Sequence, residues 1–359
     1  MSLRIIYLCW PNGWSLHNVG LALVPALAPH GVRVNVVDSR EWFARPTPAD
    51  AVCLAHTSFY WPGFPYRDHV RAVLAVLHDP DEVSTFTDRL TWRDEPMHDL
   101  PLLAAFDRVL TCSAEMVAVL RARYGVAAWH AATYPHNATA LLAARAPART
   151  PARRLEDPPP AAPARFVSTA VGPGREPWAR VFARARAPRF WTRDERGRLS
   201  LRQLRSAAVR VHRKNVPWLE RLQRALAAEP RAEVDFRYGA RHARLTEDEY
   251  LARLAGADVY VCTSYMEGGP LPVMEAVLAG LAVITTPVGQ TAEWVRDGEN
   301  GFVCRTFAEV ERAARRYARD PALVRAHRAR SREIAAAKTF DAAGWAAFFR
   351  GGAGSPAPR

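Results

Sequence analysis

The chain has 359 residues, of which 49% are hydrophobic, and its formal net charge at pH 7 is +13. This length suffices for two ordinary α/β cores. Because no apolar run reaches the roughly 18 residues of a membrane span and no signal-peptide pattern opens the chain, we expect a cytoplasmic protein, at most peripheral at a membrane or on nucleic acid. The five cysteines are odd in number and scattered without C-x-x-C spacing, which excludes a disulfide framework and argues against a zinc site.

Short apolar runs in the first 144 residues indicate the strands of a parallel sheet. The runs are RIIYLCW (4–10), VRVNVVD (32–38), AVCLAH (51–56), AVLAVLH (72–78) and RVLTCS (108–113). Helical patterns lie between some of them, as in a chain of βαβ units. We therefore predict a Rossmann-like first domain over residues 1–144.

A proline-rich stretch separates this domain from a second one. Residues 145–164 contain too much proline to fold alone, so we predict a linker there. Residues 165–339 then alternate strand and helix patterns and form a second predicted α/β domain, whereas the tail 351–359 is predicted to be disordered. The second-domain patterns are a strand at 164–172, a helix at 216–227, a strand at 233–238, a helix at 245–257 and an apolar strand ending at residue 262.

The most informative motif follows that last strand. The stretch EGGPLPVMEAVLAG, residues 267–280, places two carboxylates, Glu267 and Glu275, around the start of a helix. Gly268 and Gly269 allow a tight turn, and the free N–H groups at a helix start attract an anion. The motif therefore indicates a site for a phosphorylated ligand that carries hydroxyl groups. The simpler alternative is two acids that favour the helix dipole.

Together with Ser264, Gly280, AVITTPVGQTAEWV and NGF, this motif resembles the retaining, nucleotide-sugar-dependent glycosyltransferases of family 4, whose signature is E-x7-E. The resemblance is strong over residues 245–304. It implies the GT-B fold, with two Rossmann-like domains facing each other across a cleft and a C-terminal helix, here 340–350, packed back on the first domain. It also implies no metal and no cofactor besides the co-substrate, a nucleotide sugar such as a UDP- or GDP-sugar.

The resemblance assigns roles on the donor side. Glu267 would contact the sugar hydroxyls, Glu275 would hold the ribose, and the backbone from Gly268 and Gly269 through Pro270 to Leu271 would receive the diphosphate. A basic side chain is also expected on that diphosphate, and the candidates are Lys214, Arg213 and Arg175. Arg175 directly follows a strand, whereas Lys214 is one of only two lysines in the chain, so the sequence leaves the choice between them open.

The first domain supplies further candidates near predicted strand ends, where ligands gather in an open α/β sheet. His78 ends a predicted strand and matches by position the histidine that the family often places beside the sugar, so we group it with Glu267 and Lys214 as catalytic candidates. A structural histidine is the alternative. Asp79 is an acceptor-side candidate or a helix cap.

Two loops complete the acceptor and donor candidates. The loop PNGWSLHN, residues 11–18, lies where the family usually has a glycine-rich turn, and it offers Gly13 to the donor and Trp14 to the acceptor. The loop 56–69 is rich in aromatic residues and is either an acceptor contact or a hydrophobic cover over the first sheet. Its candidates are His56, Tyr60, Trp61 and Arg67.

Most of the positive charge lies in one segment. Between Arg165 and Lys214 there are thirteen arginines and one lysine against three acidic residues, a local net charge of +11. The basic insertion, residues 173–213, mixes these arginines with aromatic side chains, a combination that suits DNA or, alternatively, anionic lipid head groups. An arginine-rich coding bias in a solvated surface segment is the third reading.

These observations predict a retaining glycosyltransferase that moves a sugar from a nucleotide sugar to a hydroxyl acceptor, which we take to be a hydroxylated base in DNA. Alternatives are transfer to a membrane lipid or a small metabolite, a nucleotide-sugar isomerase or phosphorylase on the same fold, and an inactive binding module. No obligate protein partner is evident. The residues leave the donor sugar, the nucleotide base and the oligomeric state open.

Overall fold

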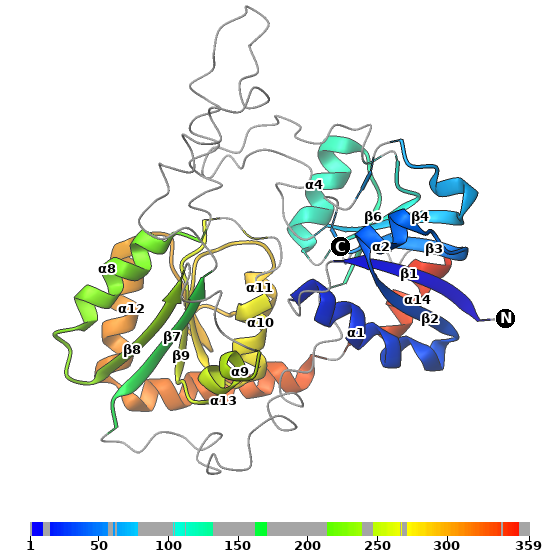
Figure 1. Ribbon diagram of the computed structural model, residues 1–359. Helices are drawn as coiled ribbons and strands as arrows, with labels where there is room; N and C mark the ends of the chain where they lie inside the picture. Colours follow the sequence, from blue (N-terminus) through cyan, green and yellow to red (C-terminus); the bar gives the residue numbers. More distant parts are fainter. Residues whose placement is uncertain are drawn as a thin grey trace, which may run out of the picture. The chain divides into compact units, whose positions relative to one another are not determined.

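The computed structural model describes residues 2–9, 15–56, 60–61, 63–77, 103, 105–111, 113–131, 162–170, 214–238, 247–265, 267, 271–338 and 340–351. The chain divides into two compact units (Figure 1), one formed by Met1–Asn137 with Lys338–Arg359 and the other by Ala138–Ala337. Each unit is built on a parallel sheet with helices packed against it. This confirms the predicted α/β class.

The first unit contains a six-stranded sheet in the order β2-β1-β3-β4-β5-β6, in which all neighbouring strands are parallel. The first five strands coincide with the predicted apolar runs, whereas the three-residue β6 is too short to leave a pattern in the sequence. The strands are β1 (Leu3–Cys9), β2 (Val32–Asp38), β3 (Ala49–Leu54), β4 (Val70–Leu77), β5 (Arg108–Thr111) and β6 (Ala128–His130). The helices are α1 (Ser15–Leu27), η1 (Ala28–His30), α2 (Ser39–Ala44), η3 (Tyr66–Asp68), α4 (Ala114–Tyr124) and α14 (Ala342–Arg350).

The C-terminal helix α14 belongs to this first unit. Arg108 at the start of β5 donates a hydrogen bond of 3.0 Å to the backbone oxygen of Phe349. Phe348 is fully buried, with its ring centroid 5.9 Å from that of Trp129 on β6. Helix α14, which follows the second unit in the chain, therefore forms part of the hydrophobic core of the first unit.

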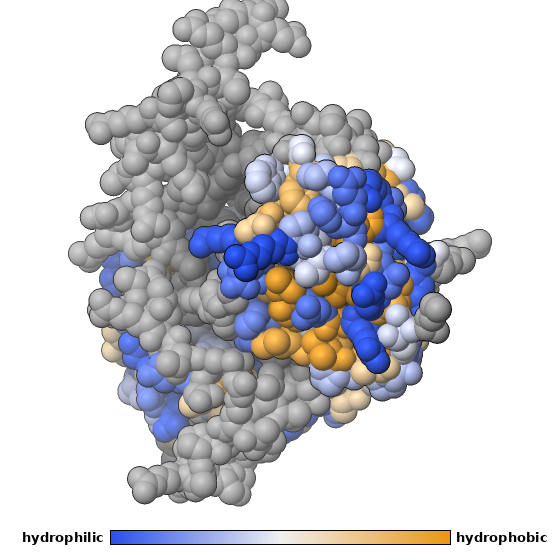
Figure 2. All heavy atoms as spheres, turned by 45° about the vertical axis from the view of Figure 1, so that its right-hand side comes forward, coloured by the Kyte–Doolittle hydropathy of each residue, from blue (hydrophilic) through white to orange (hydrophobic). Residues whose placement is uncertain are grey.

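Helix α1 is apolar on more than its buried side. It contains no charged residue, and Leu21 and Val24 on its outer face are 49% and 39% exposed. Figure 2 shows that one face of the first unit carries hydrophobic surface between hydrophilic residues. With 13 residues, α1 is too short to span a bilayer. The same holds throughout the described part of the chain, where no helix is both long and apolar enough to do so.

The second unit contains a five-stranded parallel sheet in the order β11-β10-β9-β7-β8. Its strands are β7 (Ala164–Ala170), β8 (Ala232–Tyr238), β9 (Val259–Cys262), β10 (Ala282–Thr285) and β11 (Gly301–Val303). Its helices are α8 (Val216–Leu226), α9 (Glu247–Ala255), α10 (Leu271–Leu278), α11 (Thr291–Trp294), α12 (Phe307–Arg319) and α13 (Pro321–Ala337). Leu219 and Leu222 of α8 and Val310 of α12 are almost fully buried in one core against this sheet.

A buried ion pair ties α13 to the amino edge of the second sheet. The Arg328 guanidinium lies 2.7 Å from a carboxylate oxygen of Asp258, which directly precedes β9, and donates a 3.2 Å hydrogen bond to the carbonyl of Gly280. Both charged side chains are almost completely buried. The pair therefore fixes the edge of the sheet opposite to the one at which β7 and β9 end.

Candidate functional site

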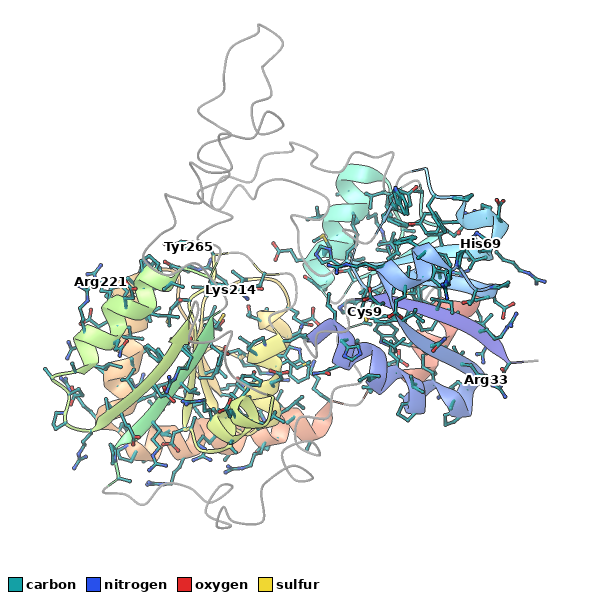
Figure 3. The ribbon with its side chains drawn as sticks, viewed as in Figure 1. Cys9, Arg33, His69, Lys214, Arg221 and Tyr265 are labelled. Atoms are coloured by element: carbon teal, nitrogen blue, oxygen red, sulfur yellow. The ribbon has the colours of Figure 1, made fainter. Side chains whose placement is uncertain are left out.

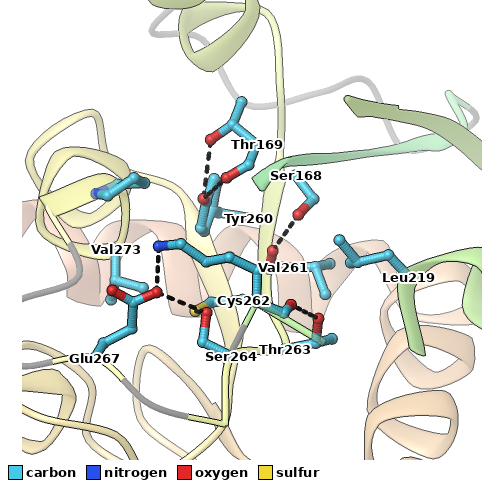
Figure 4. Close-up of a pocket in the computed structure, with 12 residues that line it drawn as sticks. Ser168, Thr169, Leu219, Tyr260, Val261, Cys262, Thr263, Ser264, Glu267 and Val273 are labelled. Carbon is cyan, nitrogen blue, oxygen red and sulfur yellow. Dashed lines mark hydrogen bonds and ion pairs between the residues drawn. The ribbon is translucent and has the colours of Figure 1, made fainter. Parts of the chain in front are cut away.

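Because β7 and β9 run parallel, their carboxyl ends lie at one edge of the second sheet, and a pocket lies there (Figure 4). In open α/β sheets, ligands bind at this edge. Its walls come from the ends of both strands and from the segments that follow them. The lining residues are Ser168, Thr169, Lys214, Leu219, Tyr260, Val261, Cys262, Thr263, Ser264, Glu267, Pro272 and Val273.

The backbone before α8 holds Lys214 at this edge. Asn215 adopts a left-handed conformation, with φ of 48°, and α8 begins at the next residue. The Thr263 hydroxyl lies 3.2 Å from the carbonyl oxygen of Lys214 and 3.3 Å from that of Asn215, and it donates to both. Because Thr263 directly follows β9, the loop that carries Lys214 is tied to the strand end. Figure 3 shows Lys214 at the same end of the second unit as Tyr265.

Glu267 meets Lys214 inside the pocket. The Lys214 ammonium forms an ion pair with Glu267 Oε1, and the Ser264 hydroxyl donates a hydrogen bond of 3.0 Å to the same oxygen (Figure 4). The side chains of Lys214 and Glu267 are only 15% and 5% exposed, so water screens the pair weakly. Burial raises the pKa of the neighbouring Cys262 thiol, which therefore stays protonated and lies 3.6 Å from the Ser264 hydroxyl as a weak donor.

Glu275 is held by a different kind of donor. It lies in α10 and is 6% exposed, and the Tyr250 hydroxyl on α9 donates a hydrogen bond to its Oε2. Burial, followed by the charge of Glu275, raises the pKa of Tyr250 well above its ordinary value, so the phenol remains a neutral donor. Glu267 is thus paired with a cation, and a phenol is one of the partners of Glu275.

The structure brings Lys214 and Glu267 together and places Glu275 on the helix that follows. Leu271 begins α10 and is buried. The other predicted donor, catalytic and acceptor residues of the loops lie outside the described residues. They are Gly13, Trp14, His78, Asp79, Arg175, Arg213, Gly268, Gly269 and Pro270.

The predicted acceptor residues of the first unit do not share one place. His56 follows β3 at the carboxyl edge of its sheet. Arg67 instead pairs at 2.8 Å with Asp107, which precedes β5, so it lies at the amino edge. Tyr60 stacks on Tyr66 with ring centroids 5.4 Å apart.

Trp61 packs with the same aromatic group: its ring centroid lies 5.8 Å from that of Phe64, and 52% of its surface is exposed. Tyr60 and Trp61 therefore belong to an aromatic layer that runs toward the amino edge.

Across the described ranges, no group of three or more His, Cys, Asp or Glu residues is placed to hold a metal ion.

Several hydroxyl-bearing residues in or near the pocket escaped the sequence analysis. Tyr250 lies inside a predicted helix, and Thr169 and Tyr260 lie inside predicted strands, where hydroxyl-bearing residues carry no spacing signal. Only the fold shows that these three hydroxyls gather beside Glu275. Thr263 directly follows a predicted strand. A polar side chain at the carboxyl end of a strand, where ligands bind in open α/β sheets, was the one sequence signal that could have identified it.

Residues 222–334 match the family described as Glycosyl transferases group 1. No curated protein matches the chain. Among solved structures, the chain is similar to a sucrose-phosphate synthase from Thermosynechococcus elongatus, with 17% identity, a TM-score of 0.55 and coverage of 98% of this chain and 97% of that chain. It is also similar to Anabaena HepE in complex with UDP and glucose, with 15% identity, a TM-score of 0.51 and coverage of 95% and 96%.

A third similar structure is S. aureus TarM in complex with fondaparinux, α-GlcNAc-glycerol and UDP, with 12% identity and a TM-score of 0.51. The match covers 83% of this chain and 55% of TarM, so the chain spans about half the length of that protein. These likenesses, with the two parallel-sheet units, confirm the predicted GT-B fold. The segment that matches the family lies in the second unit and includes Glu267 and Glu275.

Proposed function

We propose that the protein is a retaining, nucleotide-sugar-dependent glycosyltransferase of family 4 that binds its donor on the second unit. The observation that carries the proposal is the pair of buried carboxylates, Glu267 and Glu275, at the carboxyl edge of the second sheet, with Lys214 paired to the first. That edge is where open α/β sheets bind ligands. The family match over this segment supports the assignment, and HepE and TarM were both solved with UDP.

Each acid suits a set of neutral hydroxyl groups, because a carboxylate accepts hydrogen bonds from a vicinal diol. In our proposal, Glu275 accepts from the ribose, and Glu267 accepts from the donor sugar. Gly268, Gly269 and Pro270 precede the N-terminus of α10, whose free N–H groups favour the diphosphate. Of the two basic candidates that the sequence left open, Lys214 has the support of geometry because it lines the pocket.

The transfer breaks the bond between the anomeric carbon and the diphosphate oxygen and forms a bond from that carbon to the acceptor oxygen. Negative charge grows on the departing diphosphate, and in our proposal Lys214, which lines the pocket, stabilises that charge. The acceptor hydroxyl gives its proton to the leaving phosphate oxygen on the same face of the sugar, which retains the anomeric configuration. Glu267 orients the sugar in this step.

For the acceptor we propose DNA that carries a hydroxylated base. The support is compositional: the segment from Arg165 to Lys214 has a net charge of +11 and interleaves arginine with aromatic residues. A lipid or polyprenyl carrier and a small metabolite are the competing acceptors. They differ from DNA in how their binding responds to salt and to lipid composition.

Calorimetry tests whether the protein binds the nucleotide part of the proposed donor. Wild-type protein is titrated with UDP, GDP and ADP, and we expect one of them to bind and Glu275→Ala to lose that binding without a change in fold. Glu333→Ala, which removes an exposed acid on α13, is the matched control and should bind as the wild type does. If no nucleoside diphosphate binds, the protein is an inactive module on this fold.

Binding measurements over a series of salt concentrations test whether DNA is the acceptor. Duplex DNA binding is measured between low and physiological salt for wild type and for a variant with Arg180, Arg184, Arg186 and Arg189 changed to Gln. We expect tight binding with a steep salt slope that becomes shallower in the variant. Binding that vanishes near physiological salt rejects DNA, and sedimentation with anionic liposomes then identifies a lipid acceptor. Donor consumption without any acceptor indicates an isomerase or phosphorylase instead.

A further inference from the structure

Lys214 and Glu267 lie inside the pocket, and each is the charged partner of the other. The Lys214 ammonium forms an ion pair with Glu267 Oε1, and the same oxygen accepts the 3.0 Å hydrogen bond from the Ser264 hydroxyl (Figure 4). All three side chains line the pocket, and those of Lys214 and Glu267 are 15% and 5% exposed. A ligand that fills the pocket therefore meets both charges.

A diphosphate in this pocket competes with Glu267 for the Lys214 ammonium. A lysine carries its charge as a single compact point, so a move toward phosphate weakens the contact with the acid. Among the described residues, the neutral hydroxyl of Ser264 is then the hydrogen-bond donor that remains to Glu267. A buried carboxylate that loses its cation is costly, so binding of the diphosphate is opposed by the broken pair.

The sugar of the ligand determines how much of this cost remains. A nucleotide sugar brings the hydroxyl groups that the proposed function assigns to Glu267, so the carboxylate exchanges an ion pair for hydrogen bonds. A free nucleoside diphosphate has no sugar on its terminal phosphate, and its extra negative charge repels the acid. The broken pair therefore weakens binding of the free nucleoside diphosphate more than binding of the nucleotide sugar.

We propose that the ion pair between Lys214 and Glu267 determines specificity, because it shifts the preference of the protein from the free nucleoside diphosphate toward the nucleotide sugar. This inference rests on the proposed function, in which the nucleoside diphosphate is the product. It gives Glu267 a second role: after the sugar has been transferred, the acid pairs with Lys214 again and weakens the contact between the ammonium and the departing diphosphate.

The surroundings of the pair allow Lys214 to change partners. The Thr263 hydroxyl donates to the carbonyl oxygen of Lys214, which holds the main chain at the base of the side chain. Ser264 is 3% exposed, and its hydroxyl donates to Glu267 while its carbonyl oxygen accepts from the Thr286 hydroxyl. The acid and the base of the lysine are thus held, whereas the four-carbon stem of the lysine is flexible. The ammonium can change partners without a change in fold.

The experiment compares Glu267→Gln with wild type in calorimetric titrations without acceptor. The first probe is the nucleoside diphosphate that wild type binds most tightly among UDP, GDP and ADP. The second is the glucose, N-acetylglucosamine or mannose derivative of that diphosphate that wild type binds most tightly. We expect Glu267→Gln to bind the free diphosphate about fivefold more tightly, as loss of an ion pair at the upper end of the exposed range implies. The variant should bind the nucleotide sugar no more tightly than wild type does.

A double-variant cycle shows whether this gain depends on Lys214. Direct repulsion between Glu267 and the phosphates would also give Glu267→Gln a gain, but that gain would persist after Lys214→Met. We expect Lys214→Met and the double variant to bind the diphosphate with the same affinity. Thermal unfolding checks the fold of each variant. Glu333→Gln, which neutralises an exposed acid on α13, is the control and should bind as wild type does.

NMR of the lysine side chains follows the exchange without a substitution of Lys214. Protein labelled with ¹³C at the lysine Cε atoms has two such signals, from Lys214 and Lys338, and Lys338→Arg assigns them. We expect the Lys214 signals of wild type and Glu267→Gln to differ in the free proteins. They should coincide when the diphosphate is bound, because the ammonium then contacts phosphate in both proteins.

Three results overturn the inference while the proposed function stands. They are unchanged or weaker binding of the diphosphate by Glu267→Gln, a gain that persists after Lys214→Met, and Lys214 signals that differ as much with bound diphosphate as without it. A wild type that binds none of the three diphosphates overturns the proposed function itself.

Discussion

Lys214 and Glu267 form a buried ion pair although α8, β8, α9 and β9 separate them in the chain. Lys214 stands just before α8, and Glu267 stands between β9 and α10. The Thr263 hydroxyl ties the first segment to the strand that leads to the second. In our proposal, this pair joins the cation assigned to the diphosphate and the acid assigned to the sugar hydroxyls.

Replacing Lys214 by methionine keeps the length of the side chain and removes its charge. We expect donor affinity to fall by about 1.5–3 kcal/mol, the value of a hydrogen bond to a charged group. The Tm should also fall, because Glu267 loses its cation while 5% exposed. Calorimetry and thermal unfolding measure both, and Arg224→Met, which removes an exposed charge from α8, is the control. Unaltered donor affinity in Lys214→Met contradicts its assignment to the diphosphate.

Glu267→Gln keeps the shape of the side chain but removes the charge that pairs with Lys214. We expect kcat to fall at least about tenfold, or about 1.4 kcal/mol, with a smaller effect on UDP affinity, because the acid is assigned to the sugar and not to the nucleotide. Steady-state turnover of the nucleotide sugar and titration with UDP give the two quantities. Equal losses in both would place Glu267 on the nucleotide instead.

Arg328→Met leaves Asp258 without its buried cation at the amino edge of the second sheet. Breaking such a pair costs about 3–5 kcal/mol of unfolding free energy, whereas the double change Arg328→Met with Asp258→Asn should recover part of it. Urea unfolding measures the difference. UDP affinity should stay constant, because this pair lies at the edge away from the pocket. A loss below about 1 kcal/mol would show that water or a rearranged side chain satisfies Asp258.

The pH dependence of stability should contain a contribution from His327. Burial depresses the pKa of this histidine below 6.5, and its Nδ1 lies 2.7 Å from the Tyr317 hydroxyl. The unfolded chain takes up the proton first as pH falls, so this contribution is complete above about pH 6.5 and is lost as pH falls through the folded pKa. Tm measured from pH 8 to pH 5 should therefore drop more for wild type than for His327→Gln. Parallel curves would show that His327 does not titrate between the two states.

Apolar runs were enough to predict the first five strands of the first sheet and the α/β class. Strands β1, β3, β4 and β5 lie inside the sheet and are apolar because both of their faces are covered, whereas the edge strand β2 alternates buried valines with the exposed Arg33 and Asn35. The motif around Glu267 and Glu275 could also be recognised from the sequence, because its glycines, prolines and acids fall within one short stretch of chain. The three-residue strands β6 and β11 were not predicted, because so short a segment has no period.

By itself the sequence determined the two α/β domains, the paired acids after β9 and the concentration of positive charge before α8, since each of these is a property of consecutive residues. Tertiary structure alone decided that Lys214 meets Glu267, that Tyr250 holds Glu275, and that Arg67 lies at the amino edge of its sheet. These contacts join side chains from different elements, whose approach depends on strand order and helix packing and leaves no trace in local spacing.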